Sequence, residues 1–280
     1  MLNIARSSYY YQEAEDIQKQ REDADLRDRI EKIVIEHERY GYRRVTAQLK
    51  REGVVVNKKR VQRVMQQEGL ICKATKKWVK TTDSNHRYLV YPNLLKEAAI
   101  TGVNQVWVAD ITYIRILTAF VYLAVILDVF SRKVIGWALS QRIDTELTRA
   151  ALRMAIEDRR PPEGCIHHSD RGVQYAAYDY VDDLRAAGLR ISMSRKGNPY
   201  DNAHIESFIK TLKNEEVYLW DYKTLEDVKK RVPYFIEEVY NEKRLHSALG
   251  YCPPNEYESL VARKEDRSPQ TLLTLEVLCV

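Results

Sequence analysis

Three carboxylates occur in sequence contexts that suit metal chemistry. Asp110 lies in the middle of an apolar run, WVADITY, where an unpaired charge carries a desolvation penalty. Asp170 follows the run IHHS, and Glu206 lies in a helical pattern after the loop RKGNPYDN. Two metal ions about 3.5–4 Å apart are held by carboxylates from separate rigid elements, and oxygen ligands suit Mg²⁺ or Mn²⁺. Singly, each carboxylate more often has a structural role; together the three predict metal-dependent phosphoryl transfer.

A polar stripe accompanies Glu206 along the helix expected between residues 201 and 219. Asn202, Glu206, Lys210 and Lys213 fall at helical spacing, beside an apolar stripe that would pack on a sheet. The two lysines would direct ammonium groups at phosphates that flank the metal site. The alternative is an ordinary Glu–Lys surface pair, which is worth about 0.2–0.5 kcal/mol.

The pattern from residue 105 onward predicts a mixed sheet. Three runs rich in β-branched and aromatic residues are joined by short breaks and predict an antiparallel meander, at 106–116, 120–130 and 133–140. Helices and short strands then alternate, at 145–158, 165–170, 178–187 and 190–194. This order is typical of an α/β RNase H-like catalytic core.

Positive charge is concentrated before this core. Residues 41–80 hold twelve Lys or Arg and two acids, a charge of +10 against +5 for the whole chain. Three helical patterns lie between Ala24 and Leu70, with Gly53 expected to end the second and Asn57 to cap the third. A basic last helix is typical of a helix-turn-helix in a major groove, although any small basic bundle would look similar. Its expected phosphate contacts are Lys58, Lys59, Arg60 and Arg63.

Cysteine usage and hydropathy argue against several other classes of protein. The four cysteines are scattered without a C-x-x-C, so neither a structural zinc nor a disulfide framework is expected. The longest apolar run, Ile116 to Leu127, is too short for a bilayer span of roughly 20 residues. The N-terminus has no signal-peptide pattern. We therefore expect a cytoplasmic protein.

Five segments follow from these patterns. They are an N-terminal segment (1–23), a helix-turn-helix domain (24–70), a basic linker that orders only on a partner (71–104), the catalytic core (105–219), and a C-terminal helical region with a tail (220–280).

Specific motifs in these segments resemble a known family. Asp170 and Glu206 are separated by 35 residues, as in the D-D-x(35)-E pattern of IS3-type insertion-sequence transposases, within the retroviral-integrase superfamily. WVADITY, HHSDRGVQY and GNPYDNAHIESFIKTLKNE resemble the family's three core motifs. YNEKRLHSALGYCPPNEY and LRDRIEKIVIEHERYGYRRVTAQLKREG resemble its C-terminal and N-terminal signatures. The resemblance covers roughly Leu26 to Tyr257 and identifies the chain as a member of this family.

The resemblance implies a DDE transposase. Such an enzyme cleaves DNA at element ends with Mg²⁺, for which Mn²⁺ substitutes, and the exposed 3′-hydroxyl attacks another phosphodiester. Asp110, Asp170 and Glu206 would be catalytic metal ligands. Further DNA contacts would come from Arg195, Lys196, Asn198, Tyr200, Asn202, Lys210 and Lys213. Supports of the ligands would be His168, Ser169, Arg171 and Gln174, together with Gly172 and Tyr175 of the same motif.

The resemblance also implies partners. They are double-stranded DNA, as terminal inverted repeats and as target, and a second copy or a larger assembly on that DNA. Members of the family commonly gain an upstream reading frame by frameshift, and the opening LNIARSSYYYQ resembles such a junction. A bacterial, nucleoid-associated protein is expected. Two alternatives remain open: a metal-dependent nuclease of the same fold, and a non-catalytic DNA-binding regulator.

Overall fold

The computed structural model describes residues 6–70, 88–195 and 199–265 and separates into two compact units, Met1–Lys76 and Lys77–Val280. Each unit has its own buried core. None of the helices in the described ranges combines the length and apolarity that a membrane span requires.

Three helices form the first unit: α1 (Arg6–Glu36), α2 (Tyr42–Arg51) and α3 (Lys58–Gln67). The side chain of Asn57 accepts from the backbone N–H of Lys59 at 2.9 Å, so the predicted cap of α3 is confirmed. Gly53 follows α2 with a φ of +82°, which a glycine adopts without strain. The buried core is made of Leu26, Ile30, Ile33, Tyr40, Val45, Leu49, Val61, Val64 and Met65.

Helix α1 begins earlier than the apolar pattern indicated. It starts at Arg6, inside the segment 1–23 that the sequence separated from the helix-turn-helix domain. The stretch QEAEDIQKQREDADL contains neither Gly nor Pro and is rich in strong helix formers, so helical propensity extends the helix beyond its buried face. Periodicity marks only the part of a helix that packs, which explains the difference.

A five-stranded sheet organises the second unit. Its strands are β1 (Val106–Arg115), β2 (Phe120–Asp128), β3 (Val134–Ser140), β4 (Ile166–Ser169) and β5 (Arg190–Met193). The order across the sheet is β3-β2-β1-β4-β5. The first three strands pair antiparallel, while β4 pairs parallel with both β1 and β5. This confirms the predicted meander followed by alternating helices and strands, and with it the RNase H-like core.

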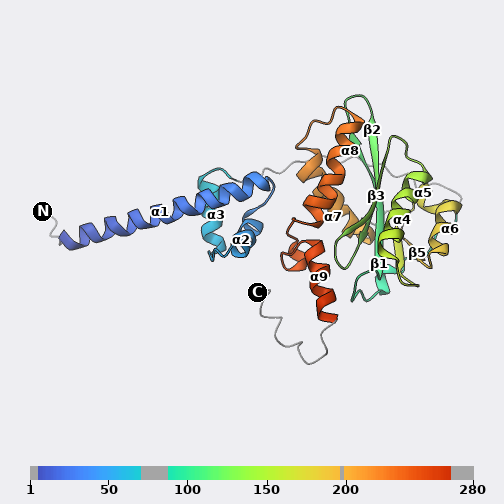
Figure 1. Cartoon of the computed structure of the whole chain (residues 1–280), viewed down its shortest axis with the longest axis horizontal. Helices are drawn as coiled ribbons and strands as arrows, with labels where there is room; N and C mark the ends of the chain where they lie inside the picture. The colour runs from blue at the N-terminus through green and yellow to red at the C-terminus, as the bar shows by residue number, and fades with distance from the viewer. Residues whose placement is uncertain (1–5, 71–87, 196–198, 266–280) are drawn as a thin grey trace. The chain divides into compact units, whose positions relative to one another are not determined.

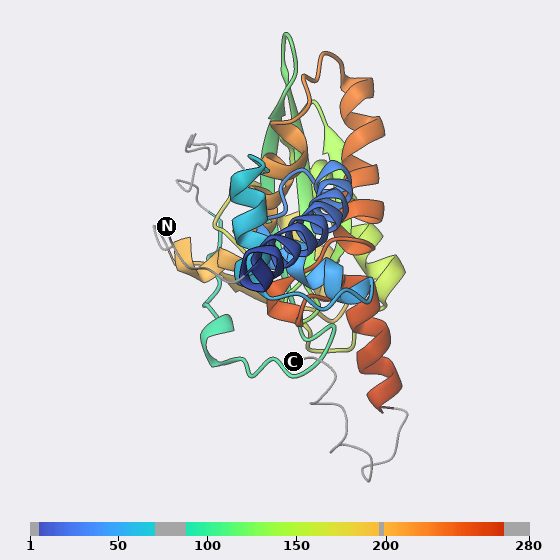
Figure 2. The same ribbon diagram turned by 90° about the vertical axis from the view of Figure 1, so that its left-hand side faces the viewer.

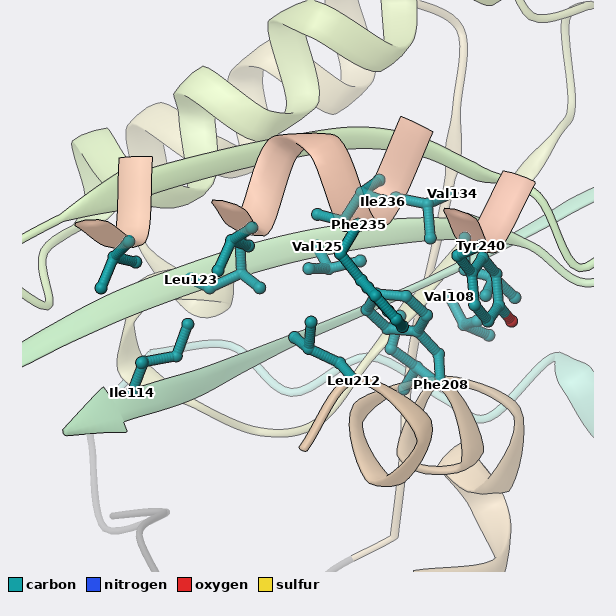
Figure 3. Packing of buried hydrophobic residues seen from close by; sticks show 14 of the residues in the cluster. Val108, Ile114, Leu123, Val125, Val134, Phe208, Leu212, Phe235, Ile236 and Tyr240 are labelled. Carbon is teal, nitrogen blue, oxygen red and sulfur yellow. The ribbon is translucent and has the colours of Figure 1, made fainter. Parts of the chain in front are cut away.

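Helices cover both faces of this sheet (Figure 1). One face carries α4 (Thr145–Arg159), α5 (Val173–Ala176) and α6 (Tyr178–Ala186). The other carries α7 (Ala203–Leu212) and α8 (Leu225–Tyr234). Figure 3 shows Phe208 and Leu212 of α7 pointing into the space between that helix and the strands, where Phe235 meets them. The buried stripe of α7 is thereby fixed against the sheet, as its sequence pattern predicted.

Two helices after β5 change their hydrogen-bond register partway along. The helix expected at 201–219 consists of a 3₁₀ turn (η2, Pro199–Asn202), α7, and a π-helical turn (η3, Lys213–Val217). In the C-terminal helical region expected from residue 220, the first helix consists of α8 and a π-helical segment (η4, Phe235–Asn241). Pro233 accounts for the second change, because it cannot donate a backbone hydrogen bond inside the helix. Beyond it lie η5 (Ser247–Leu249) and α9 (Pro254–Glu265).

Part of the expected linker belongs to the second unit. Residues 71–87 lie outside the described residues, whereas 88–104 include a 3₁₀ turn, η1 (Leu95–Glu97). The backbone N–H of Leu94 donates to Ser192 Oγ at 2.9 Å, and Leu94, Leu95, Ala98 and Ile100 pack against the sheet's core. Apolar contacts therefore order this stretch without a partner, contrary to the expectation for it.

Gly136 on β3 provides a test of the packing against α4. A Cβ added there would lie 2.3 Å from the carbonyl oxygen of Ala151 and 2.8 Å from the Cβ of Ala155. Gly136→Ala must displace the helix, so we expect a loss of about 1–3 kcal/mol in the free energy of unfolding. Urea titration followed by tryptophan fluorescence measures it, since all four tryptophans lie in residues 77–280. Gly102→Ala is the control, because its new methyl group would meet only the side chain of Gln105, at 3.4 Å. Equal unfolding midpoints for both variants would contradict this packing.

Candidate active site

Asp110 and Asp170 lie next to each other where the pairing of the parallel strands β1 and β4 ends. The last pair is Ala109 of β1 with Ser169, the final residue of β4. Asp110 follows Ala109 and Asp170 follows Ser169, so both aspartates come directly after this pair. Neighbouring strands are about 4.8 Å apart, which places the two residues side by side at this edge. Asp110 Oδ1 accepts from the N–H of Ile111 at 2.8 Å, and Asp170 Oδ1 accepts from the N–H of Gly172 at 2.8 Å. A Cβ at Gly172 would lie 2.9 Å from that oxygen, so a larger residue would crowd Asp170.

Helix α7 brings Glu206 to the aspartates. The side-chain N–H of Asn202 donates to the carbonyl oxygen of Ala109 at 3.2 Å, which ties the start of the helix to the residue before Asp110. Ile205, Phe208 and Leu212 bury the apolar side of α7. Glu206, between the first two, is only partly buried, and its negative charge acts on Asp110.

The electrostatics of the site favour a bound cation. Burial first, and then the negative charge of Asp170, raise the pKa of Asp110 from 3.8 to about 8. Burial also raises the pKa of Glu206. Ionising these carboxylates side by side is costly, and a divalent cation would compensate that cost.

The residues present fit such a cation chemically, with one adjustment. Three carboxylates offer the oxygen donors that Mg²⁺ prefers. Two buried polar atoms nearby, Tyr175 Oη and Asn202 Oδ1, have no hydrogen-bond partner in the described structure. Within the described ranges, however, no three acidic, His or Cys side chains are already gathered closely enough to enclose a metal. Binding therefore requires side-chain movement, which the partly exposed Glu206 has room to make.

The residues expected to support Asp170 connect its turn to neighbouring segments. His168 is buried between the hydroxyls of Ser192 (2.8 Å from Nδ1) and Ser194 (3.0 Å from Nε2), and burial lowers its pKa to about 4. The neutral imidazole uses both ring nitrogens in these hydrogen bonds and so links β4 to β5. Neither nitrogen is therefore available as a metal ligand. Three other expected supports donate to backbone carbonyl oxygens: Ser169 Oγ to that of Asp170, Arg171 Nε to that of Ser194, and Gln174 Nε2 to that of Ile143.

The expected DNA contacts of this unit occupy different environments. Lys210 is exposed, whereas the Lys213 ammonium lies 4.6 Å from the centroid of the Tyr113 ring. Asn202 is buried. Arg195 holds both carboxylate oxygens of Asp201 at 3.1 Å, and this guanidinium keeps the pKa of Asp201 well below its usual value. Lys196, Asn198 and the side chain of Tyr200 lie outside the described residues.

The four expected phosphate contacts of α3 fall into two groups. Lys58 and Lys59, at the start of α3, are exposed. Arg60 and Arg63 instead donate to Asp23 of α1 at 2.8 and 2.7 Å. The pKa of Asp23, which burial alone would raise, is held below its usual value by these two guanidinium groups. Both arginines thus have an observed role in joining α3 to α1.

Tyr175, expected as a further support in the Asp170 motif, has a buried hydroxyl whose pKa is raised by burial first and then by the charges of Tyr180, Asp110 and Asp170. Two other site features were missed by sequence reasoning. The π-helical turn after α7 has no sequence signal that we can identify. The ion pair between Arg195 and Asp201 follows from a loop geometry that residue types alone do not specify.

Family models match the chain in three places. An integrase core domain matches residues 101–199, a second integrase core domain model matches 187–254, and an HTH-like domain matches 20–78. The first two together contain Asp110, Asp170 and Glu206. The third spans α2, α3 and most of α1.

Curated relatives align over most of the chain. An uncharacterised 31 kDa protein of insertion element IS600 from Shigella sonnei is 42% identical, covering 91% of this chain and 94% of its own. The transposase for IS904 from Lactococcus lactis is 40% identical, covering 83% and 93%. Transposase InsF for IS3A from Escherichia coli is 40% identical, covering 79% and 77%.

Solved structures with related folds are more distant. A simian T-cell lymphotropic virus intasome chain, solved with a PP2A regulatory subunit, has 17% identity and a TM-score of 0.47, covering 81% of this chain and 72% of that one. The catalytic core domain of HTLV-2 integrase, solved with magnesium, has 16% identity and a TM-score of 0.42, covering 56% and 97%.

The sheet order and the matches to the integrase-core and HTH-like family models define an integrase-type polynucleotidyl transferase with a DNA-binding helix-turn-helix domain. More narrowly, the chain belongs to the IS3 family of insertion-sequence transposases. It is thus a DNA transposase.

Proposed function

We propose that Asp110, Asp170 and Glu206 are the catalytic metal ligands, and that Mg²⁺ is the ion they hold. The observation that carries this proposal is the adjacency of the two aspartates at the β1–β4 edge, with α7 tied to the same rung through Asn202. Bound Mg²⁺ would activate the attacking oxygen and stabilise the leaving oxygen of an in-line phosphoryl transfer. Mn²⁺, with the same preference for oxygen ligands, would substitute.

The protein's own residues would position the reacting DNA. The N–H groups of Ile111 and Gly172 each hold one carboxylate oxygen of Asp110 and Asp170 in place. Lys210 is exposed four residues after Glu206, one helical turn along α7, where an ammonium group would hold a phosphate beside the scissile one. The substrate would be the element's terminal inverted repeats, cleaved first and then joined to target DNA through the exposed 3′-hydroxyl.

The direct test uses the full chain, Mg²⁺ and duplex DNA carrying the terminal repeats of the insertion element that encodes it. We expect nicks at the repeat ends followed by joined products that contain both end and target sequence. Nicks without joined products at any target concentration would instead support a nuclease. Uncleaved DNA in both Mg²⁺ and Mn²⁺, with binding intact, would favour a regulator or a requirement for the upstream reading frame.

Two copies acting on paired ends would be the working assembly, because joining needs two ends held together. This chain alone or its fusion to an upstream frame could form that assembly on bacterial chromosomal DNA. Light scattering of the complex with the paired repeats measures the number of chains. A single chain per pair of ends during joining would contradict the proposal.

Lys58 and Lys59 would supply the phosphate contacts of the helix-turn-helix domain. Their double substitution by Ala should weaken binding to every duplex sequence and reduce the slope of log K against log salt by about 2, since each neutralised phosphate contributes about 0.9. Fluorescence anisotropy between roughly 50 and 200 mM salt measures the slope. Lys229→Ala, which removes an exposed lysine of α8, is the control. An unchanged slope in the double variant would mean that the start of α3 does not meet phosphates.

A further inference from the structure

One face of helix α3 is polar and open to solvent. Val61, Val64 and Met65 bury the opposite side of the helix. Four residues at helical spacing make up the outer face: Lys59, Gln62, Arg63 and Gln66. Gln62 is partly buried and the other three are exposed. Because α3 contains no acidic residue, this face can approach a polyanion without repulsion from its own helix.

The arginines of α3 are engaged by α1, whereas two of its glutamines are not engaged. Arg60 and Arg63 both donate to Asp23 of α1, at 2.8 and 2.7 Å, so their guanidinium groups are held at that helix. An arginine that reads guanine must instead present two N–H groups to the O6 and N7 atoms of the base. Among residues 6–70, by contrast, no hydrogen bond engages the side chain of Gln62 or Gln66. The uncharged polar groups that remain for a ligand are these two amides.

Acidic side chains of this unit gather on another side of it. A cleft between α1 and α2 has a lining that includes four acids: Asp25, Asp28, Glu36 and Glu52. The described residues of α3 contribute nothing to this lining. Figure 2, which looks nearly along α1, shows α2 and α3 on different sides of that helix. A duplex that approaches the outer face of α3 therefore meets the exposed Lys58 and Lys59 and avoids the acidic cleft.

From these contacts we propose that Gln62 and Gln66 read adenine bases in the major groove of the DNA that this unit binds. The amide of glutamine matches adenine, because it accepts from N6 and donates to N7 at the same time. The two residues are four positions apart, about 6 Å along the helix axis at 1.5 Å per residue. That rise corresponds to about two base-pair steps of 3.4 Å each. The ligand is thus a duplex segment that contains two A·T pairs roughly two steps apart.

This inference rests on the proposed function, because the phosphate contacts of Lys58 and Lys59 are what would seat α3 on duplex DNA. It adds the class of base pair that gives the contact its specificity. Phosphate contacts fix the position of a protein on DNA but carry no sequence information of their own. The two amides would make the distinction between sequences that the lysines cannot make.

Selection from a library of duplexes with randomised sequence tests the inference. The full-length protein is used in EDTA, where no DNA is cut, and the bound duplexes are sequenced. The enriched duplexes should share two A·T pairs about two steps apart. Gln62→Ala and Gln66→Ala should each remove the preference at one of these pairs. In anisotropy titrations, each variant should bind the enriched duplex roughly 5- to 100-fold more weakly, with binding to random-sequence duplex unchanged.

Two further variants separate base reading from a general effect on the helix. Gln66→Arg should change the preferred pair at its position from A·T to G·C, because a guanidinium donates to both O6 and N7 of guanine. A merely structural role for Gln66 would give lost affinity without a new preference. Gln67→Ala is the matched control, since it removes an exposed glutamine of the same helix that lies beside Arg60 and Arg63. It should leave the selected sequence unchanged.

The inference is overturned if the wild type enriches no common sequence, or if Gln62→Ala and Gln66→Ala enrich the same sequence as the wild type. Failure of the proposed function gives other results. If the selected sequence depends on both glutamines but Mg²⁺ yields neither nicks nor joined products, the catalytic assignment fails and base reading stands. If the double lysine variant flattens the salt slope while the glutamine variants change nothing, base reading fails and the phosphate contacts stand.

Discussion

Glu206→Gln should abolish strand cleavage, by roughly a thousandfold or more, while DNA binding and folding are retained. The amide has nearly the same shape as the carboxylate but no charge, so it cannot complete an oxygen site for two divalent ions. Because Glu206 is only partly buried and the described structure shows it in no ion pair, its loss leaves no charge stranded in the core. Gel analysis of end-labelled duplexes in Mg²⁺ measures nicked and joined products.

Glu226→Gln on α8 is the matched control, since it removes an exposed glutamate. It should retain full activity. A Glu206→Gln protein that still cleaves at a tenth of the wild-type rate, in either Mg²⁺ or Mn²⁺, would exclude this residue as a ligand. Asp170→Asn provides an independent check, because this variant should also lose strand cleavage while it still binds DNA.

The fold was largely predictable because its signals are local. Strands β1 to β3 are continuous β-branched and aromatic runs, and the breaks between them are too short for anything except hairpins. The parallel pairing of β4 was predictable because helix α4 stands before it and permits a crossover. By contrast, the start of α1 and the packing of residues 88–104 could not be predicted from periodicity. The former rests on helical propensity alone, and the latter on contacts with residues distant in sequence.

The identity of the candidate site residues could be predicted from the sequence, but several of their contacts could not. The apolar strand around Asp110 and the spacing between Asp170 and Glu206 were enough to select the three carboxylates. The pairing of Arg60 and Arg63 with Asp23 was not foreseen, because Asp23 belongs to a helix segment that shows no apolar pattern. Asn202 falls on the polar stripe of the sequence, but the 3₁₀ turn before α7 rotates it inward to Ala109. A helical wheel assumes one continuous register, and this segment changes register at both ends.

Asp110→Asn should stabilise the metal-free protein although it removes a proposed ligand. The wild-type carboxyl has its pKa raised from 3.8 to about 8 by burial and by Asp170. Between these two values the folded protein binds more protons than the unfolded chain, so wild-type stability falls as pH rises through this window. The amide has no such penalty. The gain should therefore be small near pH 4 and reach about 2–4 kcal/mol near pH 8, after allowance for the water that still reaches the half-buried group.

Urea unfolding in EDTA, followed by tryptophan fluorescence at pH 5, 6.5 and 8, measures that gain in the catalytic unit. Mg²⁺ should reverse the order, because an ion that binds only the folded wild type stabilises it and leaves Asp110→Asn nearly unchanged. Asp182→Asn, at an exposed position on α6, should show neither effect. A gain of equal size at pH 5 and pH 8 would mean that shape and not charge is responsible. A loss of stability at every pH would mean that Asp110 is a structural residue, and the site would then have to be sought around a different set of carboxylates.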